Sequence, residues 1–311
     1  MSNAKSRIVR VAAVQMESKN GLVEANLEHA TPLVEQAAKA GAKVILLPEF
    51  MPVGYIFSTA IWDGAEPKHG PTVQWLRETS KKFGVWIGTS FLEADGKDFF
   101  NTFVLATPDG GEAGRVRKQT PAIFEAFYTK SGLGPHILET ELGKIGVGIC
   151  YENQLTYIPE IMQGQSTDIL LMPHSFPKAG QIIMSLKDLA VRYARLLGIP
   201  TIVCNKSGPW RSPYPGLPFY ITNSHFPGLS TIADSDGSVK AQLGGEENVI
   251  VADVTLDPSR KTNKVAPCSG RWAWRGPWLR DSARVIEAVG RLWYSLSSER
   301  KRKALKVSSA N

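Results

Sequence analysis

The run GKIGVGICYEN, residues 143–153, constrains the fold of this chain more than any other stretch. Lys144 to Ile149 is apolar and rich in glycine and β-branched residues, and polar residues follow it, which predicts a buried strand. Cys150 stands at the carboxyl end of that strand, where ligands and reactive groups collect in α/β architectures. A thiol there is either a small core residue or a nucleophile, and unpaired cysteines are most often core residues.

Two further strand-like runs end in ionisable side chains. AGAKVILLPEF stops at a proline, and Glu49 follows at once. A carboxylate at the mouth of a buried strand is unfavourable unless it is paired or takes part in chemistry. In GRVRKQTPAIFE, Lys118 ends a short strand, and Glu125 comes seven residues later across a proline turn. Three strand ends in the order Glu, Lys, Cys favour the nucleophile interpretation of Cys150.

This order resembles the nitrilase superfamily of carbon–nitrogen hydrolases, whose catalytic residues come in the same order. The similarity runs from VAAVQME near the N-terminus to VIVADVTLD and fades after about Pro258. The resemblance implies an α/β fold, an αββα sandwich in which two mixed sheets pack face to face between helical layers. It also implies that Glu49, Lys118 and Cys150 are catalytic, with Glu125 as the second glutamate of the family.

The hydrophobic pattern also indicates mixed sheets, because strands alternate with helices and with hairpins. The expected strands cover residues 8–15, 43–47, 85–91, 99–107, 114–118, 144–149, 168–172 and 200–205. The expected helices cover residues 26–40, 71–83 and 182–197, with a short helix near residue 158. Asp109-Gly110 and Ser235-Asp236-Gly237 are typical of hairpin turns.

The resemblance implies a thioester mechanism. Cys150 would attack an amide carbonyl or a nitrile carbon, and its thiol is mostly protonated at neutral pH, so it needs a base. Glu49 would be that base, protonate the departing ammonia or amine, and later activate water. Lys118 and the backbone N–H of Tyr151 would stabilise the oxyanion. Glu125 would hold Lys118 or the substrate nitrogen; the alternative is an ordinary loop glutamate.

Four residues are candidates for substrate contact: Tyr151, Asn153, His174 and Phe176. His174 follows a strand in LMPHSF, at a position where this family often contacts substrate. A Cys/His pair is another way to activate a thiol, but nothing in the sequence marks any of the five histidines as the partner of Cys150. The aromatic candidates could equally be core residues.

The substrate class is less constrained. KQTPAIFE and CYEN are similar to the nitrilase branch, whereas NQLTYIPE and RYARLLGIPTIVCNKSG are similar to the amidase branch. We expect hydrolysis of a small linear amide, with conversion of a nitrile to an acid and ammonia as the close alternative. An inactive metabolite-binding protein, or an interaction protein acting through its basic tail, is a remote alternative. No nucleotide-binding or metal-ligand spacing is present, so we expect neither cofactor nor metal.

No linker divides the 311 residues, and we expect a catalytic domain over residues 1–257 and a basic, aromatic-containing extension over 258–311. The extension holds 13 of the 36 Lys/Arg residues and three of the 29 Asp/Glu residues. Such a tail can bind nucleic acid or a membrane surface. We expect instead that its tryptophans, Trp272, Trp274 and Trp278, pack on the domain or on a partner subunit. The final ERKRKALK would be a solvated, frayed end.

A helix from Asp281 would carry an apolar stripe of Val285, Val289, Leu292 and Leu296, and amphipathic spacing of this kind first implies a buried face. We therefore expect a homodimer or higher homo-oligomer that binds neither nucleic acid nor membrane. No apolar run approaches the ~20 residues of a membrane span, and the N-terminus lacks a signal-peptide core. Three widely spaced cysteines without a CxxC pair suit a reducing cytoplasm.

Overall fold

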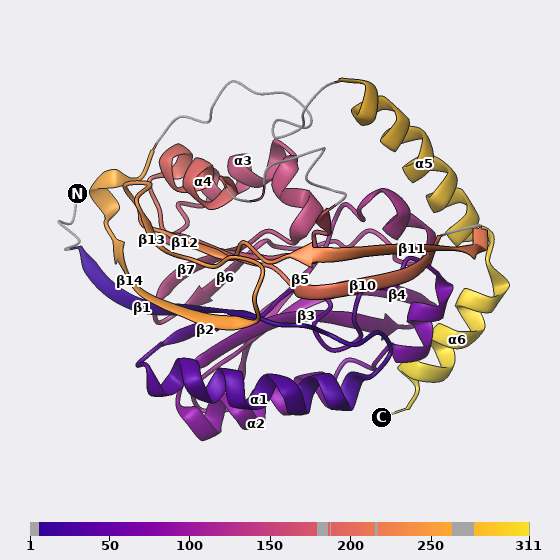
Figure 1. Ribbon diagram of the computed structural model, residues 1–311, viewed down its shortest axis with the longest axis horizontal. Helices are drawn as coiled ribbons and strands as arrows, with labels where there is room; N and C mark the ends of the chain where they lie inside the picture. Colours follow the sequence, from indigo (N-terminus) through magenta and orange to yellow (C-terminus); the bar gives the residue numbers. More distant parts are fainter. Residues whose placement is uncertain (1–5, 179–185, 187, 215–216, 263–276, 311) are drawn as a thin grey trace.

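Two six-stranded mixed sheets form the centre of the protein in the computed structural model, which describes residues 6–178, 186, 188–214, 217–262 and 277–310 (Figure 1). The first sheet runs, in spatial order, through β14 (Asn248–Leu256), β1 (Arg7–Gln15), β2 (Val44–Leu46), β3 (Trp86–Asp95), β4 (Asp98–Ala106) and β5 (Glu112–Arg117). The second runs through β13 (Val239–Gln242), β12 (Thr231–Ala233), β9 (Thr201–Cys204), β8 (Ile169–Pro173), β7 (Gly143–Val147) and β6 (Ile137–Thr140).

Both sheets follow the same plan: three parallel strands at the centre, with antiparallel strands outside them. The parallel strands are β1, β2 and β3 in the first sheet and β7, β8 and β9 in the second. A separate two-stranded ribbon is formed by β10 (Ser207–Tyr214) and β11 (Leu217–Pro227). Since the carboxyl ends of parallel neighbours meet at one edge of a sheet, residues that follow β7 and β8 can meet there. The packing of the two sheets brings Glu49, which follows β2, to the same place, where its carboxylate accepts a hydrogen bond from Ser175 after β8.

Helices cover the outer face of each sheet (Figure 1). α1 (Val23–Lys39) and α2 (Pro71–Phe83) lie on the first sheet, and α3 (Tyr157–Gly164) and α4 (Leu189–Leu197) lie on the second. Alternation along β1 explains this layering, because Val11 and Ala13 face the core between the sheets while Ala12 and Val14 face the helices. The αββα sandwich expected from the sequence is confirmed.

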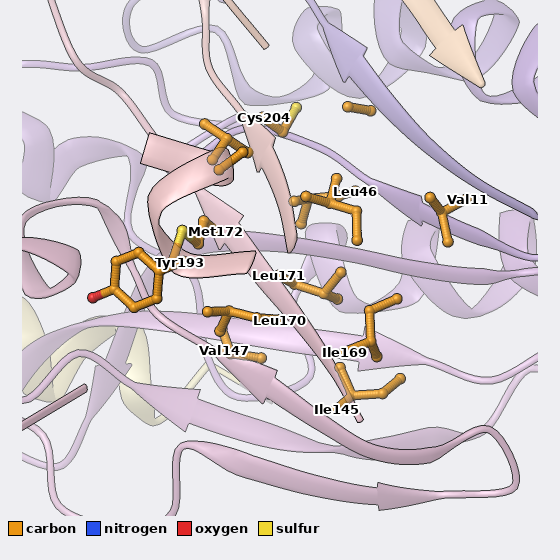
Figure 2. Packing of buried hydrophobic residues seen from close by; sticks show 14 of the residues in the cluster. Val11, Leu46, Ile145, Val147, Ile169, Leu170, Leu171, Met172, Tyr193 and Cys204 are labelled. Carbon is orange, nitrogen blue, oxygen red and sulfur yellow. The ribbon is translucent and has the colours of Figure 1, made fainter. Parts of the chain in front are cut away.

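The core between the sheets joins apolar side chains from both of them. Val11 and Leu46 of the first sheet share it with Val147 and Leu171 of the second, and all four are buried (Figure 2). The thiol of Cys204 lies at one end of the same core, where it donates a hydrogen bond to the carbonyl of Val14. A continuous core of this size fixes the two sheets relative to each other, and with them the strand ends that carry polar groups.

Several boundaries differ from the sequence prediction. β7 ends at Val147, two residues earlier than expected, and the chain then turns into a short 3₁₀ helix, η3 (Cys150–Gln154). The hairpin of β6 and β7 and the ribbon of β10 and β11 were not predicted. The ribbon contains prolines in β10, a residue type that argues against a central strand but is tolerated at a sheet edge. Of the helix expected over 182–197, the described part begins at Leu189.

The C-terminal extension forms two helices, α5 (Pro277–Leu296) and α6 (Ser298–Ser308). α5 packs against another 3₁₀ helix, η2 (Ile123–Phe127), and the buried residues in its described part are Ala283, Glu287, Gly290 and Tyr294. The valine and leucine stripe is not buried against its own domain, and its burial in a homo-oligomer stays a prediction. Its four residues lie on the opposite side of the helix and are 53–73% exposed.

The expectation of a frayed end is wrong. Ser297 caps α6 by accepting a hydrogen bond from the backbone N–H of Arg300, and Ala304 is fully buried. Of the three predicted tryptophans, Trp272 and Trp274 lie outside the described residues, as does the side chain of Trp278. None of the described helices is long and apolar enough to cross a bilayer.

Candidate active site

Three of the predicted catalytic side chains meet in one buried cluster. Glu49 follows β2, Lys118 follows β5, and Glu125 lies in η2. The Nζ atom of Lys118 is 2.7 Å from Oε1 of Glu49 and 2.5 Å from Oε2 of Glu125. The carboxylates are fully buried and Lys118 is 1% exposed. Two carboxylates therefore share one cation. Each of these buried charges has the oppositely charged partner that burial requires.

Asn101, on β4, bridges the two carboxylates from the other side. Its Nδ2 donates to Oε1 of Glu49 at 2.8 Å and to Oε1 of Glu125 at 2.9 Å. The sequence prediction missed this residue. Its signal is a polar side chain within the apolar run FFNTFVLA, because a polar residue inside a buried strand needs a hydrogen-bond partner.

The charges of this cluster shift its pKa values. Burial lowers the pKa of Lys118, but the neighbouring charges of Glu125 and Glu49 more than offset it, so the pKa is raised and the ammonium is retained. Burial raises the pKa of Glu125; Lys118 opposes that rise, and the nearby Glu49 adds to it. The cluster therefore holds a Lys118 ammonium beside two buried carboxylates, and buried carboxylates of this kind can serve as general acids and bases.

The backbone around Glu49 is held on several sides. Ser175, which follows β8, donates its N–H to Oε2 of Glu49 at 3.0 Å and its hydroxyl to the Glu49 carbonyl at 2.6 Å. The next residue, Phe50, has a φ of +47°, a left-handed conformation that non-glycine residues seldom adopt. Its N–H donates to Oγ of Ser90, and its carbonyl accepts from Nζ of Lys206 at 2.8 Å. These contacts fix the direction of the Glu49 carboxylate.

Cys150 begins η3 with a φ of +52° and is 3% exposed. A non-glycine residue in the left-handed region stores strain, and strain of this kind clusters at functional sites. Gly148 allows the turn, since a Cβ at that position would lie 2.0 Å from Oδ1 of Asn153. Cys150 is thus held on a sharp turn after β7, as the sequence indicated.

The environment of Cys150 keeps its thiol protonated. Burial raises the pKa of Cys150 well above its ordinary value, and the Glu49 carboxylate raises it further. The charge of Lys118 and the backbone N–H of Ser175 act in the opposite direction. A thiol of this kind becomes a nucleophile when a neighbouring base takes its proton. Glu49 is such a neighbour.

Glu152 connects the turn at Cys150 with the loop after Lys118. One carboxylate oxygen accepts the N–H of Gln119 at 2.6 Å and the hydroxyl of Tyr157 at 2.7 Å, and the other accepts the N–H of Ile149 at 3.2 Å. The carboxylate is fully buried. Sequence reasoning did not single out this residue, although it stands within CYEN.

The predicted contact residues Asn153 and His174 form a buried pair. Nδ2 of Asn153 lies 3.1 Å from Nε2 of His174 and also donates to the carbonyl of Gly148 at 2.8 Å. Burial lowers the pKa of His174 to about 3, and the charge of Lys118 contributes, so the imidazole is neutral. Phe176 packs edge-on against the His174 ring, with the ring centroids 6.3 Å apart. Asn153 therefore supports the Cys150 turn from within the protein.

Tyr151 is the remaining predicted contact residue, and it is 3% exposed. Its hydroxyl donates to Oε1 of Glu287 in α5 at 2.5 Å. The C-terminal extension therefore reaches the residue next to Cys150. No local sequence pattern predicts this contact, since Glu287 lies 136 residues from its partner.

Among the described residues, no group of three or more His, Cys, Asp or Glu side chains has the geometry of a metal site. Cys150 and Cys204 are both free thiols.

The chain belongs to the carbon–nitrogen hydrolase family, whose family model matches residues 10–264. It is 30% identical over 275 residues to the N-carbamoylputrescine amidase of Solanum tuberosum, covering 81% of this chain and 88% of that protein. It is 32% identical over 255 residues to a nitrilase of Pyrococcus abyssi, covering 80% and 90%. Nit3 of Saccharomyces cerevisiae, a member of branch 10 of the nitrilase superfamily, superposes with a TM-score of 0.69 at 25% identity, covering 81% and 91%. The protein is accordingly a carbon–nitrogen hydrolase, as the sequence predicted.

Proposed function

We propose that the protein hydrolyses a small linear amide through a thioester on Cys150. The observation that carries this proposal is the buried cluster of Glu49, Lys118 and Glu125 beside a cysteine on a strained turn. The N-carbamoylputrescine amidase and the Saccharomyces protein resemble this chain over about four-fifths of its length, which supports the same chemistry here.

In the proposed reaction Glu49 takes the proton of Cys150 as sulfur attacks the amide carbon. The developing oxyanion is stabilised by Lys118 and by the backbone N–H of Tyr151. Glu49 then passes the proton to the departing nitrogen, and ammonia or an amine leaves as the thioester forms. Water attacks the thioester and Glu49 accepts its proton; the carbon–sulfur bond then breaks, the carboxylic acid leaves, and Glu49 returns the proton to the Cys150 sulfur. Glu125 holds Lys118 in place through their 2.5 Å contact.

Nitrile hydrolysis is the second candidate, because the relative from Pyrococcus abyssi is named a nitrilase and is 32% identical to this chain. The same thiol could attack a nitrile carbon to give a thioimidate, which water converts to the acid and ammonia. In both routes the first bond joins the Cys150 sulfur to the substrate carbon. The amide gives a tetrahedral intermediate and the nitrile a thioimidate, and the two routes share the later thioester step.

Ammonia release from matched amides and nitriles of the same acyl group tests both candidates. We expect turnover of short linear amides by the wild-type protein and none by Cys150→Ala, with a covalent adduct on intact mass only when Cys150 is present. Cys204→Ala is the matched control, because that thiol is equally buried but donates to the Val14 carbonyl in the core. Full activity in Cys150→Ala would refute the assignment, and turnover restricted to nitriles would favour the second candidate.

We further propose that residues 1–257 form the catalytic domain and that residues 258–311 form an extension packed on it. The contact between α5 and η2 supports this division. We also propose a homo-oligomer in the cytoplasm, with no nucleic acid or membrane partner. The exposed stripe on α5 supports association, and the free thiol of Cys150 suits a reducing compartment.

A further inference from the structure

Tyr128 lies beside the candidate active site but was not among the predicted residues. It follows η2, the helix that carries Glu125, and its backbone N–H donates to the Glu125 carbonyl at 3.0 Å. Its own carbonyl accepts a hydrogen bond from Nε1 of Trp62 at 2.8 Å. The Tyr128 backbone is therefore fixed relative to one of the two cluster carboxylates.

The side chain of Tyr128 is fully buried, and its hydroxyl makes no hydrogen bond to any described residue. A buried hydroxyl without a partner is unfavourable, so nearly all such groups are satisfied. By contrast, the Tyr294 hydroxyl accepts the N–H of Phe99 at 2.8 Å. The Tyr128 hydroxyl is therefore an exception that needs an explanation.

The position of the hydroxyl provides that explanation. Tyr128 belongs to the same apolar cluster as Phe50, the neighbour of Glu49. Its pKa is raised well above the ordinary value by burial first and then by the charges of Glu125, Glu49 and Cys150. The phenol therefore stays neutral, keeps its proton, and lies near the three groups that would surround a reacting amide.

We propose that the Tyr128 hydroxyl is a substrate-binding group that forms a hydrogen bond with the amide group of the bound substrate. This inference rests on the proposed amide hydrolysis and adds a specificity residue to it. A site with a buried hydrogen-bonding group favours substrates that satisfy the group over analogues that do not. Tyr128 thus contributes to the preference for amides.

Tyr128→Phe tests the inference. Tyr294→Phe is the matched control, because it removes the same hydroxyl from a buried tyrosine whose hydroxyl already has a hydrogen-bond partner in the protein. We expect Tyr128→Phe to keep or raise the thermal midpoint and to lower kcat/KM for an amide about tenfold, the scale of one lost hydrogen bond. Tyr294→Phe should lower the midpoint and keep kcat/KM. A lowered midpoint with unchanged kcat/KM in Tyr128→Phe would show a purely structural hydroxyl and overturn the inference.

A second measurement does not depend on turnover. Iodoacetamide carries the amide group to Cys150 and alkylates its sulfur with loss of iodide, whereas methyl methanethiosulfonate modifies the thiol without an amide. Tyr128→Phe should slow only the iodoacetamide reaction, and equal slowing of both reagents, or of neither, would overturn the inference. If the wild-type protein hydrolyses no amide, the proposed function fails, yet the ratio of the two rates still tests Tyr128.

Discussion

The hydroxyl of Tyr151, the residue next to Cys150, donates a hydrogen bond to the Glu287 carboxylate at 2.5 Å. Glu287 belongs to α5, which also packs against η2, the helix that carries Glu125. Gly290 permits this packing, because a Cβ there would lie 2.8 Å from the Phe127 ring. One C-terminal helix therefore touches both the turn of the candidate nucleophile and the helix of the second glutamate.

We predict that Glu287→Ala lowers kcat/KM by about tenfold or more, because movement of Tyr151 displaces the adjoining thiol, and a 1 Å displacement can reduce a rate by roughly 10²-fold. Glu287→Gln keeps an acceptor oxygen and should retain more activity. Glu299→Gln on α6 is the control, because its carboxylate pairs with Lys303 at the surface. Steady-state kinetics of the three variants provide the measurement. Wild-type kinetics in Glu287→Ala would show that α5 does not position the turn.

Lys118 should tolerate no replacement. Lys118→Ala should lower kcat by at least ~10²-fold, the scale for losing one oxyanion donor. Lys118→Arg should also fail, because the planar guanidinium is larger than the space between carboxylates 2.7 and 2.5 Å from Nζ. Lys130→Arg is the control, since Lys130 pairs with Asp98 where half of its side chain is exposed. Kinetics and urea unfolding would be measured on the same variants. A wild-type kcat in Lys118→Arg would contradict the role of Lys118 in stabilising the oxyanion.

Lys206 should make stability depend on pH. Burial lowers its pKa from 10.5 to about 7, although the Glu49 charge opposes this shift. Between these two values the unfolded chain binds more protons than the folded protein, so this group makes stability rise with pH from about 7 to about 10.5. Lys206→Met removes the effect along with the hydrogen bond to the Phe50 carbonyl.

The measurement is urea unfolding of wild type and Lys206→Met at several pH values from 6 to 10.5. The difference between the free energies of unfolding, wild type minus variant, should increase as the pH rises from about 7 to 10.5. Parallel curves would mean that the folded and unfolded lysines titrate alike, contrary to the prediction.

Gly148→Ala should disturb the turn at Cys150. The added Cβ would lie 2.0 Å from Oδ1 of Asn153 and 3.0 Å from its Cγ, and both atoms are buried. Overpacking of this kind typically lowers stability by about 1–3 kcal/mol, and here it would also separate Asn153 from His174. Gly164→Ala is the control, since nothing lies within 4 Å of a Cβ at that exposed position. Thermal unfolding and kcat would show whether only Gly148→Ala is impaired.

Local patterns predicted strands alternating with helices and three strand ends that carry Glu49, Lys118 and Cys150, and the family resemblance implied the sandwich. The apolar runs before Glu49 and Cys150 determine where each strand stops, and the packing of the two sheets on one another then brings the ends together. Ser175 and Tyr128 could not be found in this way. Ser175 acts through a contact with a residue far along the chain and Tyr128 through a missing partner, and neither leaves a local pattern.

The α5 helix also shows that a local pattern cannot determine a contact with a distant part of the chain. Its amphipathic spacing correctly predicted a helix, but it did not determine which face is buried. The buried face contains Glu287 and Gly290, residues that a hydrophobic pattern assigns to the surface. Their places are set by Tyr151 and Phe127, which approach from distant parts of the sequence.

The outer face of α5 should be an association surface between copies of this chain. Val285, Val289, Leu292 and Leu296 are each more than half exposed and follow one another along the helix. Contiguous apolar patches on soluble proteins usually mark interaction sites. Val289→Glu should therefore reduce the mass measured by light scattering while leaving the thermal midpoint of the monomer nearly unchanged. Lys301→Glu, an equally exposed change on α6, should leave the mass unaltered. A full-length protein that is already monomeric, or a Val289→Glu variant of unchanged mass, would contradict this prediction.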